Sequence, residues 1–281
     1  KSTYVDGLLE KINKGRLHPN FHLHRTATGR LSSSNPNLQN VPRDTSIRGL
    51  FEADANSLLV VADYDQIELR IMAMFSRDEN MLTIFADGID IHAGAASLLF
   101  DKPVGEITSE ERQLGKSANF LTAYGGGAGK LSSTSGVTLA KAREIINQYY
   151  EQFNGLSLWK HKVVMKAKKD GFVTTISGRR RRLPDINSNN DELRSRAERQ
   201  AVNAIVQGSA SDICKKAMIK AQPQVASFGG KVLVQVHDEL VVNVPDDDRV
   251  DYYSDIIQES MGHGKDLNGV PIVVTANHGR T

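Results

Sequence analysis

The sequence predicts an α/β fold of the α+β type, in which helices pack on a mostly antiparallel sheet and a mostly helical segment is inserted between its strands. Three observations support this prediction. Leu58–Ala62 is an unbroken apolar run, which is typical of a buried strand. Lys231–Pro245 alternates apolar and polar residues on both sides of a short turn, as a β-hairpin does. Between these two segments, apolar residues recur mainly at helical spacing.

The composition indicates a globular protein of one large domain or two smaller ones. The 281 residues carry a net charge of only +2, so the overall charge does not predict nucleic-acid binding and local clusters have to carry that inference. Cys214 is the sole cysteine of the sequence, which excludes an internal disulfide. There is no apolar run of about 18 residues and no apolar core of a secretory signal near the start. We therefore expect an intracellular, cytoplasmic protein, with an organelle or a virus-infected cell as alternatives.

The chain before the buried strand is expected to begin with a short helix over Lys1–Leu17. The next segment, Asn20–Pro42, starts with an alternating, strand-like stretch and continues with Ser, Asn, Thr and Pro, together with Arg25 and Arg30. One interpretation is a polar loop. The other is a nucleic-acid contact, because amides, hydroxyls and arginines bind phosphates and minor-groove edges.

The buried strand runs into Asp63, and the chain is expected to turn at Tyr64–Gln66 and return as a helix from Ile67. A carboxylate at the end of a buried strand is held rigidly enough to bind a cation. The alternative is structural, because Asp65 and Glu68 match a helix capping box.

Thr108–Gly129 is expected to be a helix that begins with a Thr108–Glu111 capping box and ends at a glycine run. Along it, two cations and then two aromatic residues recur every four positions: Arg112, Lys116, Phe120 and Tyr124. This spacing places them on one face. Such a face suits a ligand with phosphates at one end and a flat base at the other.

Other polar groups allow a structural and a functional interpretation. His92 lies in the first turn of a helix capped near Asp90, either as an ordinary surface imidazole or near an anion. Arg179–Arg182 is either a solvated loop or a phosphate contact. In the helix expected over Glu192–Lys220, the row Arg199, Asn203 and Gln207 is either plain surface or a set of hydrogen-bonding groups for base edges, whereas Cys214 is expected to pack.

The hairpin expected over Lys231–Pro245 carries three titratable residues, His237, Asp238 and Glu239, at its turn. Asn-Gly or Asp-Gly is the usual occupant of a tight hairpin turn. The last residues, Val250–Thr281, are expected to add one helix and a short strand.

Taken together, these segments resemble family A DNA polymerases, the group of bacterial DNA polymerase I. Motif A is matched by DYDQIELR (Asp63–Arg70), motif B by R-x-x-x-K-x-x-x-F-x-x-x-Y-G (Arg112–Gly125) and motif C by VHDE (Val236–Glu239). Two further elements match, TATGRLSS-x-NPNLQN (Thr26–Asn40) and ERQAVNAIVQGSASD (Glu198–Asp212). The five follow the order of the family and span nearly the whole chain.

The resemblance implies a template-directed DNA polymerase that adds dNTPs to a primer by two-metal-ion nucleotidyl transfer. Two Mg²⁺ ions, with Mn²⁺ as an alternative, would be held by Asp63, Asp238 and the Tyr64 carbonyl, with Glu239 nearby. The catalytic set would be Asp63, Asp238 and Lys116. The nucleotide would be bound by Gln66, Glu68, His92, Arg112, Lys116, Phe120 and Tyr124. Primer–template DNA would be contacted by Arg30, Asn37, Gln39, Arg199, Asn203, Gln207 and His237.

The resemblance also implies that residues 1–76 and 190–281 form the palm and residues 77–189 the fingers. The thumb and exonuclease domains of the family are not found in this chain, so we expect no proofreading and a thumb supplied by a separate chain or a missing segment. Asp65 departs from the Ser found in most relatives, and we expect it to cap the helix. Three alternatives stay open: a single-subunit RNA polymerase, a catalytically inactive DNA-binding module, and a nucleotidyl transferase that uses no template.

Overall fold

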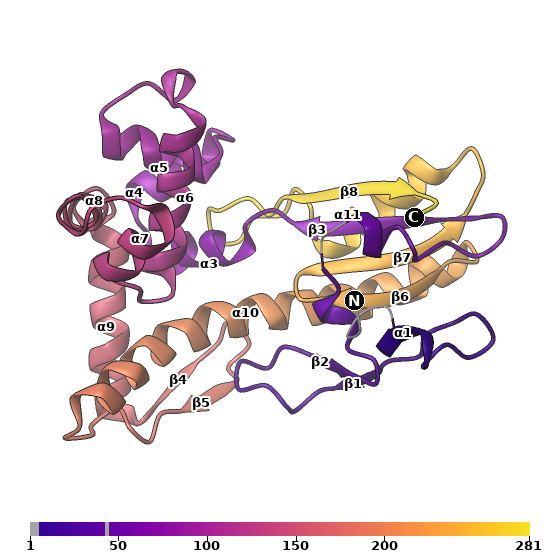
Figure 1. The fold of residues 1–281 in the computed structure, drawn as a ribbon, viewed down its shortest axis with the longest axis horizontal. Coiled ribbons are helices and arrows are strands. Elements are labelled where there is room, and N and C mark those ends of the chain that lie inside the picture. The colour runs from indigo at the N-terminus through magenta and orange to yellow at the C-terminus, as the bar shows by residue number, and fades with distance from the viewer. Residues whose placement is uncertain (1–5, 43–44) are drawn as a thin grey trace. The chain divides into compact units, whose positions relative to one another are not determined.

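The computed structural model describes residues 6–42 and 45–281, which fall into two compact units (Figure 1). The first, called the sheet unit here, comprises Lys1–Ile67, Ala210–Lys265 and Ile272–Thr281. The second, called the helical unit, comprises Glu68–Ser209 and Asp266–Pro271. The mixture of helices with an antiparallel sheet confirms the predicted fold class.

An antiparallel sheet is the centre of the sheet unit. In the described part of the chain its strands pair in the order β6 (Lys231–Val236), β7 (Glu239–Pro245), β3 (Ser57–Tyr64) and β8 (Val274–Gly279). Helix α11 (Val250–Met261) packs against this sheet. The sheet confirms the predicted strand and hairpin, and it makes β3 a central strand paired on both sides.

From Val60 to Tyr64, one face of β3 is buried. Val60 and Ala62 are inaccessible to solvent, and the buried Tyr64 side chain on the same face donates its hydroxyl to the Met261 carbonyl (2.7 Å). On the opposite face Leu59 is buried and Val61 is half-buried. Most of the apolar run is therefore buried, as predicted for this strand.

The remaining elements of the sheet unit are short, apart from the second part of α10. They are α1 (Gly7–Leu9), β1 (Asn20–His22), β2 (Ser32–Ser34), the 3-10 turn η2 (Leu38–Asn40) and α2 (Thr45–Arg48). The helix expected over Lys1–Leu17 is wrong in its extent for the described residues, because α1 has a single turn with no buried side chain to stabilise it. Residues 1–5 of that prediction lie outside the described range.

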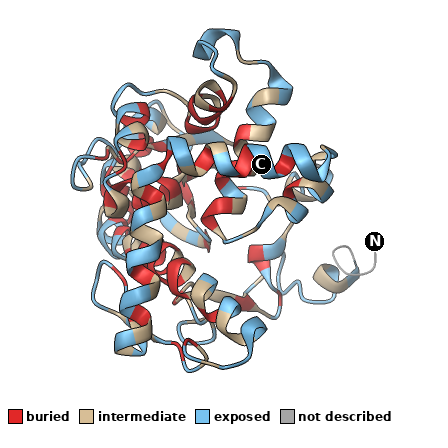
Figure 2. Ribbon diagram, turned by 90° about the vertical axis from the view of Figure 1, so that its left-hand side faces the viewer, coloured by how far each residue is buried: buried red, intermediate tan, exposed pale blue. Residues whose placement is uncertain are grey.

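The helical unit contains the inserted segment. Its elements are α3 (Ile67–Ser76), α4 (Glu79–Ala86), α5 (Ile91–Phe100), η3 (Val104–Glu106), α6 (Ser109–Ala123), α7 (Ala128–Ser135), α8 (Leu139–Gln152), α9 (Asn154–Asp170), β4 (Phe172–Thr174), β5 (Arg180–Arg182) and the first part of α10 (Asp191–Ser227). Figure 2 shows buried and exposed positions mixed along most of these helices, as expected for amphipathic helices. The arginine run is not a loop, because Arg180–Arg182 pairs with β4 as a strand.

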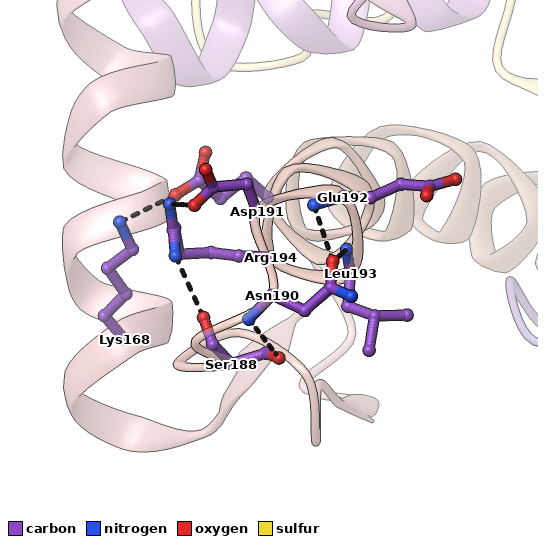
Figure 3. A network of polar contacts seen from close by, with 8 residues as sticks. Lys168, Ser188, Asn190, Asp191, Glu192, Leu193 and Arg194 are labelled. Carbon is purple, nitrogen blue, oxygen red and sulfur yellow. Dashed lines mark hydrogen bonds and ion pairs between the residues drawn. The ribbon is translucent and has the colours of Figure 1, made fainter.

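The start of α10 is held by a network of polar contacts (Figure 3). Asn190 caps the helix, since its side-chain oxygen accepts from the N–H groups of Glu192 (2.9 Å) and Leu193 (3.3 Å). Arg194 donates to the Ser188 carbonyl (3.0 Å) and to the Asp191 carboxylate. These contacts explain why a long helix begins directly after a polar loop. In the part of the chain that the structure describes, neither α10 nor any other helix is both long and apolar enough to cross a membrane.

Candidate functional site

Strand ends of the sheet unit form a cavity of about 340 Å³ that holds the two aspartates expected to act together. This acidic cavity is lined by Gln39, Asn40, Val41, Arg48, Asp63, Val236, His237, Asp238 and Glu239. The pairing of β3 with β7 brings Asp63 and Asp238 to it: Asp63 lies opposite Glu239, and the Tyr64 N–H donates to the Asp238 carbonyl (3.4 Å). Two residues far apart in the sequence thus share one cavity because their strands are neighbours.

The turn that presents Asp238 has an unusual backbone. His237 adopts the left-handed conformation (φ +56°), which disfavours residues with a side chain by roughly 1–2 kcal/mol and is usually taken by glycine or asparagine. The turn therefore keeps an imidazole and a carboxylate at a cost in stability. Such a cost is typical of a functional turn.

Cys214 lies near enough to the acidic cavity to be affected by the charges of Asp63 and Asp238. Burial, together with the charges of Asp238 and Asp63, raises the pKa of Cys214 to about 12. Cys214 is therefore a packed, protonated thiol, as predicted, and it accepts a hydrogen bond from the Gln235 amide (3.5 Å). The other polar groups of the cavity lining include three carboxylates, the His237 imidazole and Arg48, whose guanidinium lies 3.9 Å from the Glu239 carboxylate.

Among the residues expected at this site, Gln39 lines the acidic cavity, and its amide also donates to the Gln235 carbonyl (3.0 Å). Three others do not line it. Asn37 instead caps η2, accepting from the Gln39 N–H (3.1 Å). Arg30 is half-buried elsewhere in the sheet unit, although its charge lowers the pKa of Cys214. Gln66 has a left-handed backbone (φ +54°) at the turn before α3.

Asp65 has a contact that the sequence did not indicate. Both of its carboxylate oxygens accept from the Thr275 hydroxyl of β8 (3.0 Å each). Because α3 begins at Ile67, Gln66 and not Asp65 directly precedes the helix. The capping role of Asp65 stays a prediction. The structure shows its carboxylate in contact with Thr275.

In the helical unit, α6 presents the predicted cation–aromatic face. The Thr108–Glu111 capping box forms as expected, and α6 ends at Ala123, before Gly125 with φ +73°. The rings of Phe120 and Tyr124 are nearly parallel, 6.4 Å apart at an angle of 2°, and Phe120 is 40% exposed. A partly exposed pair of parallel aromatic rings offers a surface on which a flat base can stack.

Arg112, at the other end of this face, is paired with Asp90. Its guanidinium donates to both carboxylate oxygens (3.1 and 3.0 Å), and Asp90 also caps α5 by accepting from the Ala93 N–H (2.8 Å). These contacts, with Arg112 as the largest favourable one, lower the pKa of Asp90 against the opposing effect of burial. The pair joins the start of α5 to α6.

Tyr124 and Glu68 form a second link in the helical unit. The Tyr124 hydroxyl donates to the Glu68 carboxylate, so two residues expected to bind the nucleotide are in direct contact. Next to Tyr124, the side-chain stem of Arg199 lies over Gly125: a Cβ at Gly125 would be 2.5 Å from Arg199 Cγ. The glycine after Tyr124 therefore allows α10 to approach.

His92 is not the surface imidazole that was one of its two interpretations. It is 4% exposed and its ring lies 5.5 Å from the Phe120 ring. Burial lowers the pKa of His92 to about 4. At neutral pH it is therefore an uncharged group beside the Arg112 and Lys116 face.

The row on α10 is also more than plain surface. Arg199 is exposed, and Asn203 and Gln207 are half-buried. The side-chain oxygen of Asn203 is shielded from solvent and accepts no hydrogen bond from the described residues. Leaving a buried amide oxygen without a donor costs about 1–3 kcal/mol, and a bound ligand would recover it.

Sequence reasoning missed several residues of these sites. Asp90 was expected only as a cap, Arg48 was not considered, and the buried residues Asn119 and Tyr149 gave no functional signal. Asn119 had one available clue, since a polar amide inside a helix has to be satisfied somewhere. Its partners lie on two other helices, which the sequence cannot pair.

Comparisons with known proteins agree with the site residues in pointing to one family. The chain is 40% identical to a thermostable DNA polymerase I of Thermus filiformis, in an alignment that covers 100% of this chain and 34% of that protein. It is 40% identical to DNA polymerase I of Pseudomonas aeruginosa, covering 99% of this chain and 31% of that protein. The chain thus spans about a third of these relatives.

A solved structure is similar over nearly the whole fold. The POL domain of Pol1 from M. smegmatis, solved in complex with DNA primer-template and dNTP, matches with a TM-score of 0.93 and 39% identity, over 99% of this chain and 50% of that one. The model of DNA polymerase family A matches residues 1–281. The chain therefore belongs to DNA polymerase family A.

Proposed function

We propose that this chain is the nucleotide-adding part of a DNA-directed DNA polymerase: it transfers dNTPs to a primer 3′-hydroxyl on a DNA template, with divalent metal ions. The observation that carries the proposal is the acidic cavity, which gathers Asp63 from β3 and Asp238 from the turn between β6 and β7. Family membership supports the reaction class, and the M. smegmatis structure shows that a similar fold binds primer-template and dNTP.

The residues of the acidic cavity fit Mg²⁺, with Mn²⁺ as an alternative. Carboxylate and carbonyl oxygens are the ligands these hard cations prefer. The described residues contain no group of three or more His, Cys, Asp or Glu side chains arranged as a complete metal site. Mg²⁺ is commonly held by one or two carboxylates together with substrate phosphates, so Asp63, Asp238 and the Tyr64 carbonyl would hold two ions only with the nucleotide present. When bound, such ions activate the attacking hydroxyl and neutralise the leaving phosphates.

We assign the nucleotide to the α6 face of the helical unit. Arg112 and Lys116 would bind the triphosphate, and the parallel rings of Phe120 and Tyr124 would contact base and sugar. Lys116 would in addition stabilise charge as pyrophosphate leaves. The contact between Tyr124 and Glu68 holds the carboxylate in place to reject a 2′-hydroxyl.

We assign primer-template DNA to two sets of residues. In the sheet unit these are Arg30, Asn37, Gln39 and His237, with Glu239 beside the metal-binding carboxylates. In the helical unit they are Arg199, Asn203 and Gln207. The buried oxygen of Asn203 supports this assignment, because it offers an acceptor to a base or sugar donor.

We further propose that residues 1–76 and 190–281 act as the palm and residues 77–189 as the fingers, which close on a correct nucleotide. The helical unit, Glu68–Ser209, contains this fingers segment whole. We propose no proofreading by these residues and a thumb from elsewhere in the polymerase. A primer with a mismatched 3′ end tests the first point: excision of the mismatch by the purified chain would contradict it.

Primer extension on a labelled primer-template tests the proposed function directly. We expect dNTP addition that requires Mg²⁺ and is abolished in Asp63→Ala, while DNA binding in a gel-shift assay is retained. Asp87→Ala, at the exposed end of α4, is the matched control and should extend normally. Equal extension by Asp63→Ala and the native chain would refute the proposal.

The same assay separates the alternatives. A single-subunit RNA polymerase would incorporate NTPs at least as well as dNTPs, whereas we expect a strong preference for dNTPs because of Glu68. An inactive DNA-binding module would bind DNA without extending it. An untemplated nucleotidyl transferase would add nucleotides irrespective of the template base.

A further inference from the structure

A buried chain of hydrogen bonds connects His92 to two residues with no role in the function proposed above. Asn119 of α6 donates through its side-chain nitrogen towards Nδ1 of His92 (3.0 Å) and to the Ile91 carbonyl (3.2 Å). Tyr149 of α8 donates its hydroxyl to the side-chain oxygen of Asn119 (2.7 Å). Asn119 and Tyr149 are fully buried, and helices α5, α6 and α8 are packed together in the helical unit (Figure 1).

The geometry fixes the direction of every hydrogen bond in this chain. The Ile91 carbonyl can only accept, so the Asn119 atom facing it must be the NH₂ group. The same NH₂ group faces His92 Nδ1, so Nδ1 must also accept. A neutral imidazole with an accepting Nδ1 carries its proton on Nε2. The Ile91 carbonyl fixes the amide, because a flipped amide would place two acceptors, Asn119 Oδ1 and the Ile91 carbonyl, against each other. Tyr149 supports this orientation, because its hydroxyl donates to the Asn119 oxygen that would otherwise be buried without a donor.

We propose that Asn119 and Tyr149 are positioning residues that hold His92 as the neutral tautomer protonated on Nε2, so that His92 offers the nucleotide an uncharged N–H donor. The ligand part of this inference rests on the proposed function; the tautomer does not. The positive charge at this face would then come from Arg112 and Lys116, while His92 would contribute a directional N–H hydrogen bond.

The charged and titratable groups around His92 are consistent with this assignment. Burial is the largest effect on its pKa and lowers it; Asp90 raises it, and Arg112 and Lys116 of α6 lower it. From α8, Tyr149 faces Asn119, and burial strongly raises the pKa of Tyr149, so its hydroxyl stays protonated and continues to donate. Asn119, as a neutral donor to Nδ1, offers no acceptor for a second imidazole proton.

Two-bond ¹H–¹⁵N correlation spectra of the ¹⁵N-histidine-labelled chain test the tautomer without any nucleotide. His92→Gln assigns the signal among the eight histidines. We expect a protonated Nε2, an unprotonated Nδ1 and no titration between pH 8 and about 5.5. A signal protonated on Nδ1, or titration near pH 6.5, would overturn the proposal even if the chain proves to be a polymerase.

Asn119→Asp is the decisive variant, because it replaces the donor with a carboxylate acceptor of the same size. We expect its His92 to be protonated on both nitrogens at pH 7. If this variant does not fold, Tyr149→Phe replaces it: loss of the hydroxyl leaves the buried Asn119 oxygen without its donor, which weakens the preference for the native amide orientation, and we expect a mixture of tautomers. A native-like tautomer in whichever of the two variants is measured would contradict the positioning roles.

Kinetics test the uncharged donor. The KM for dNTP should change less than about twofold between pH 6 and 8 in the native chain, and at least about fivefold in Asn119→Asp. His92→Gln, which keeps an N–H donor, should raise KM less than His92→Ala does. Equal KM values for the Gln and Ala variants would show that the N–H is not used, and normal spectra with no polymerase activity would count against the proposed function alone.

Discussion

The acidic cavity of the sheet unit and the α6 face of the helical unit hold their functional groups in different ways. In the acidic cavity, Asp63 and Asp238 are fixed by backbone pairing between β3 and β7. On α6, the groups are held by side chains: Asp90 pairs with Arg112, Glu68 accepts from Tyr124, and Asn119 reaches His92. Backbone ladders place atoms rigidly, whereas side-chain pairs can be exchanged for a ligand.

This difference predicts which kinetic constant each region controls. Groups that act on charge as it develops in the transition state should affect kcat, whereas groups that bind substrate and transition state alike should affect KM. We expect the acidic cavity to control kcat and the α6 face to control mainly KM.

The largest effect is expected for Asp238→Asn. The amide keeps the shape of the side chain but removes a charged ligand, so kcat should fall by at least about 10³-fold with a KM change below about threefold. Single-nucleotide extension under steady-state conditions measures both constants. Asp246→Asn, just beyond the end of β7, is the control. An unchanged kcat in Asp238→Asn would show that Asp238 is not a ligand of the metal ions.

A smaller effect, on KM and not on kcat, is expected for Arg112→Ala. Loss of a charge-assisted contact with phosphate is worth about 1.5–3 kcal/mol, which corresponds to roughly 10–100-fold in KM. The exposed Arg143 of α8 gives the matched control, Arg143→Ala, with unchanged constants. If Arg112→Ala lowered kcat and left KM unchanged, the contrast between the two regions would be wrong.

The next largest effect is expected from a change in the packing between α5 and α6. A Cβ on Gly115 would lie 2.5 Å from the His92 carbonyl oxygen and 3.0 Å from the Ala96 nitrogen, so Gly115→Ala must push the helices apart. We expect a loss of about 1–3 kcal/mol in unfolding free energy and a several-fold rise in KM, measured by urea denaturation and by extension. Gly129→Ala, in open space on α7, should instead be neutral or stabilising. Comparable destabilisation by both variants would rule out the packing explanation.

The two regions also differ in how much of them the sequence predicts, because one is held by backbone pairing and the other by side-chain contacts. The acidic cavity was predictable because strand position and the Asp63 and Asp238 motifs are local features of the chain. The spacing of the α6 face was equally visible. The burial of His92 and its link to Tyr149 were not, because they depend on which helices pack together. Asp65 is the counterexample near the acidic cavity, since its partner Thr275 lies on β8 and no local pattern pairs the two.

Asp65→Ser should have the smallest effect and tests how sharply the acidic cavity is defined. Asp65 is two residues from Asp63 but does not line the cavity, and its carboxylate accepts from Thr275. A serine hydroxyl can also hydrogen-bond Thr275, and serine is favoured near the start of a helix. We therefore expect kcat and KM within about twofold of the native values, with an unchanged Mg²⁺ requirement in a metal titration. A collapse of Mg²⁺-dependent extension in Asp65→Ser would mean that Asp65 is a third carboxylate of the metal site, and backbone pairing of β3 and β7 would no longer account for its geometry.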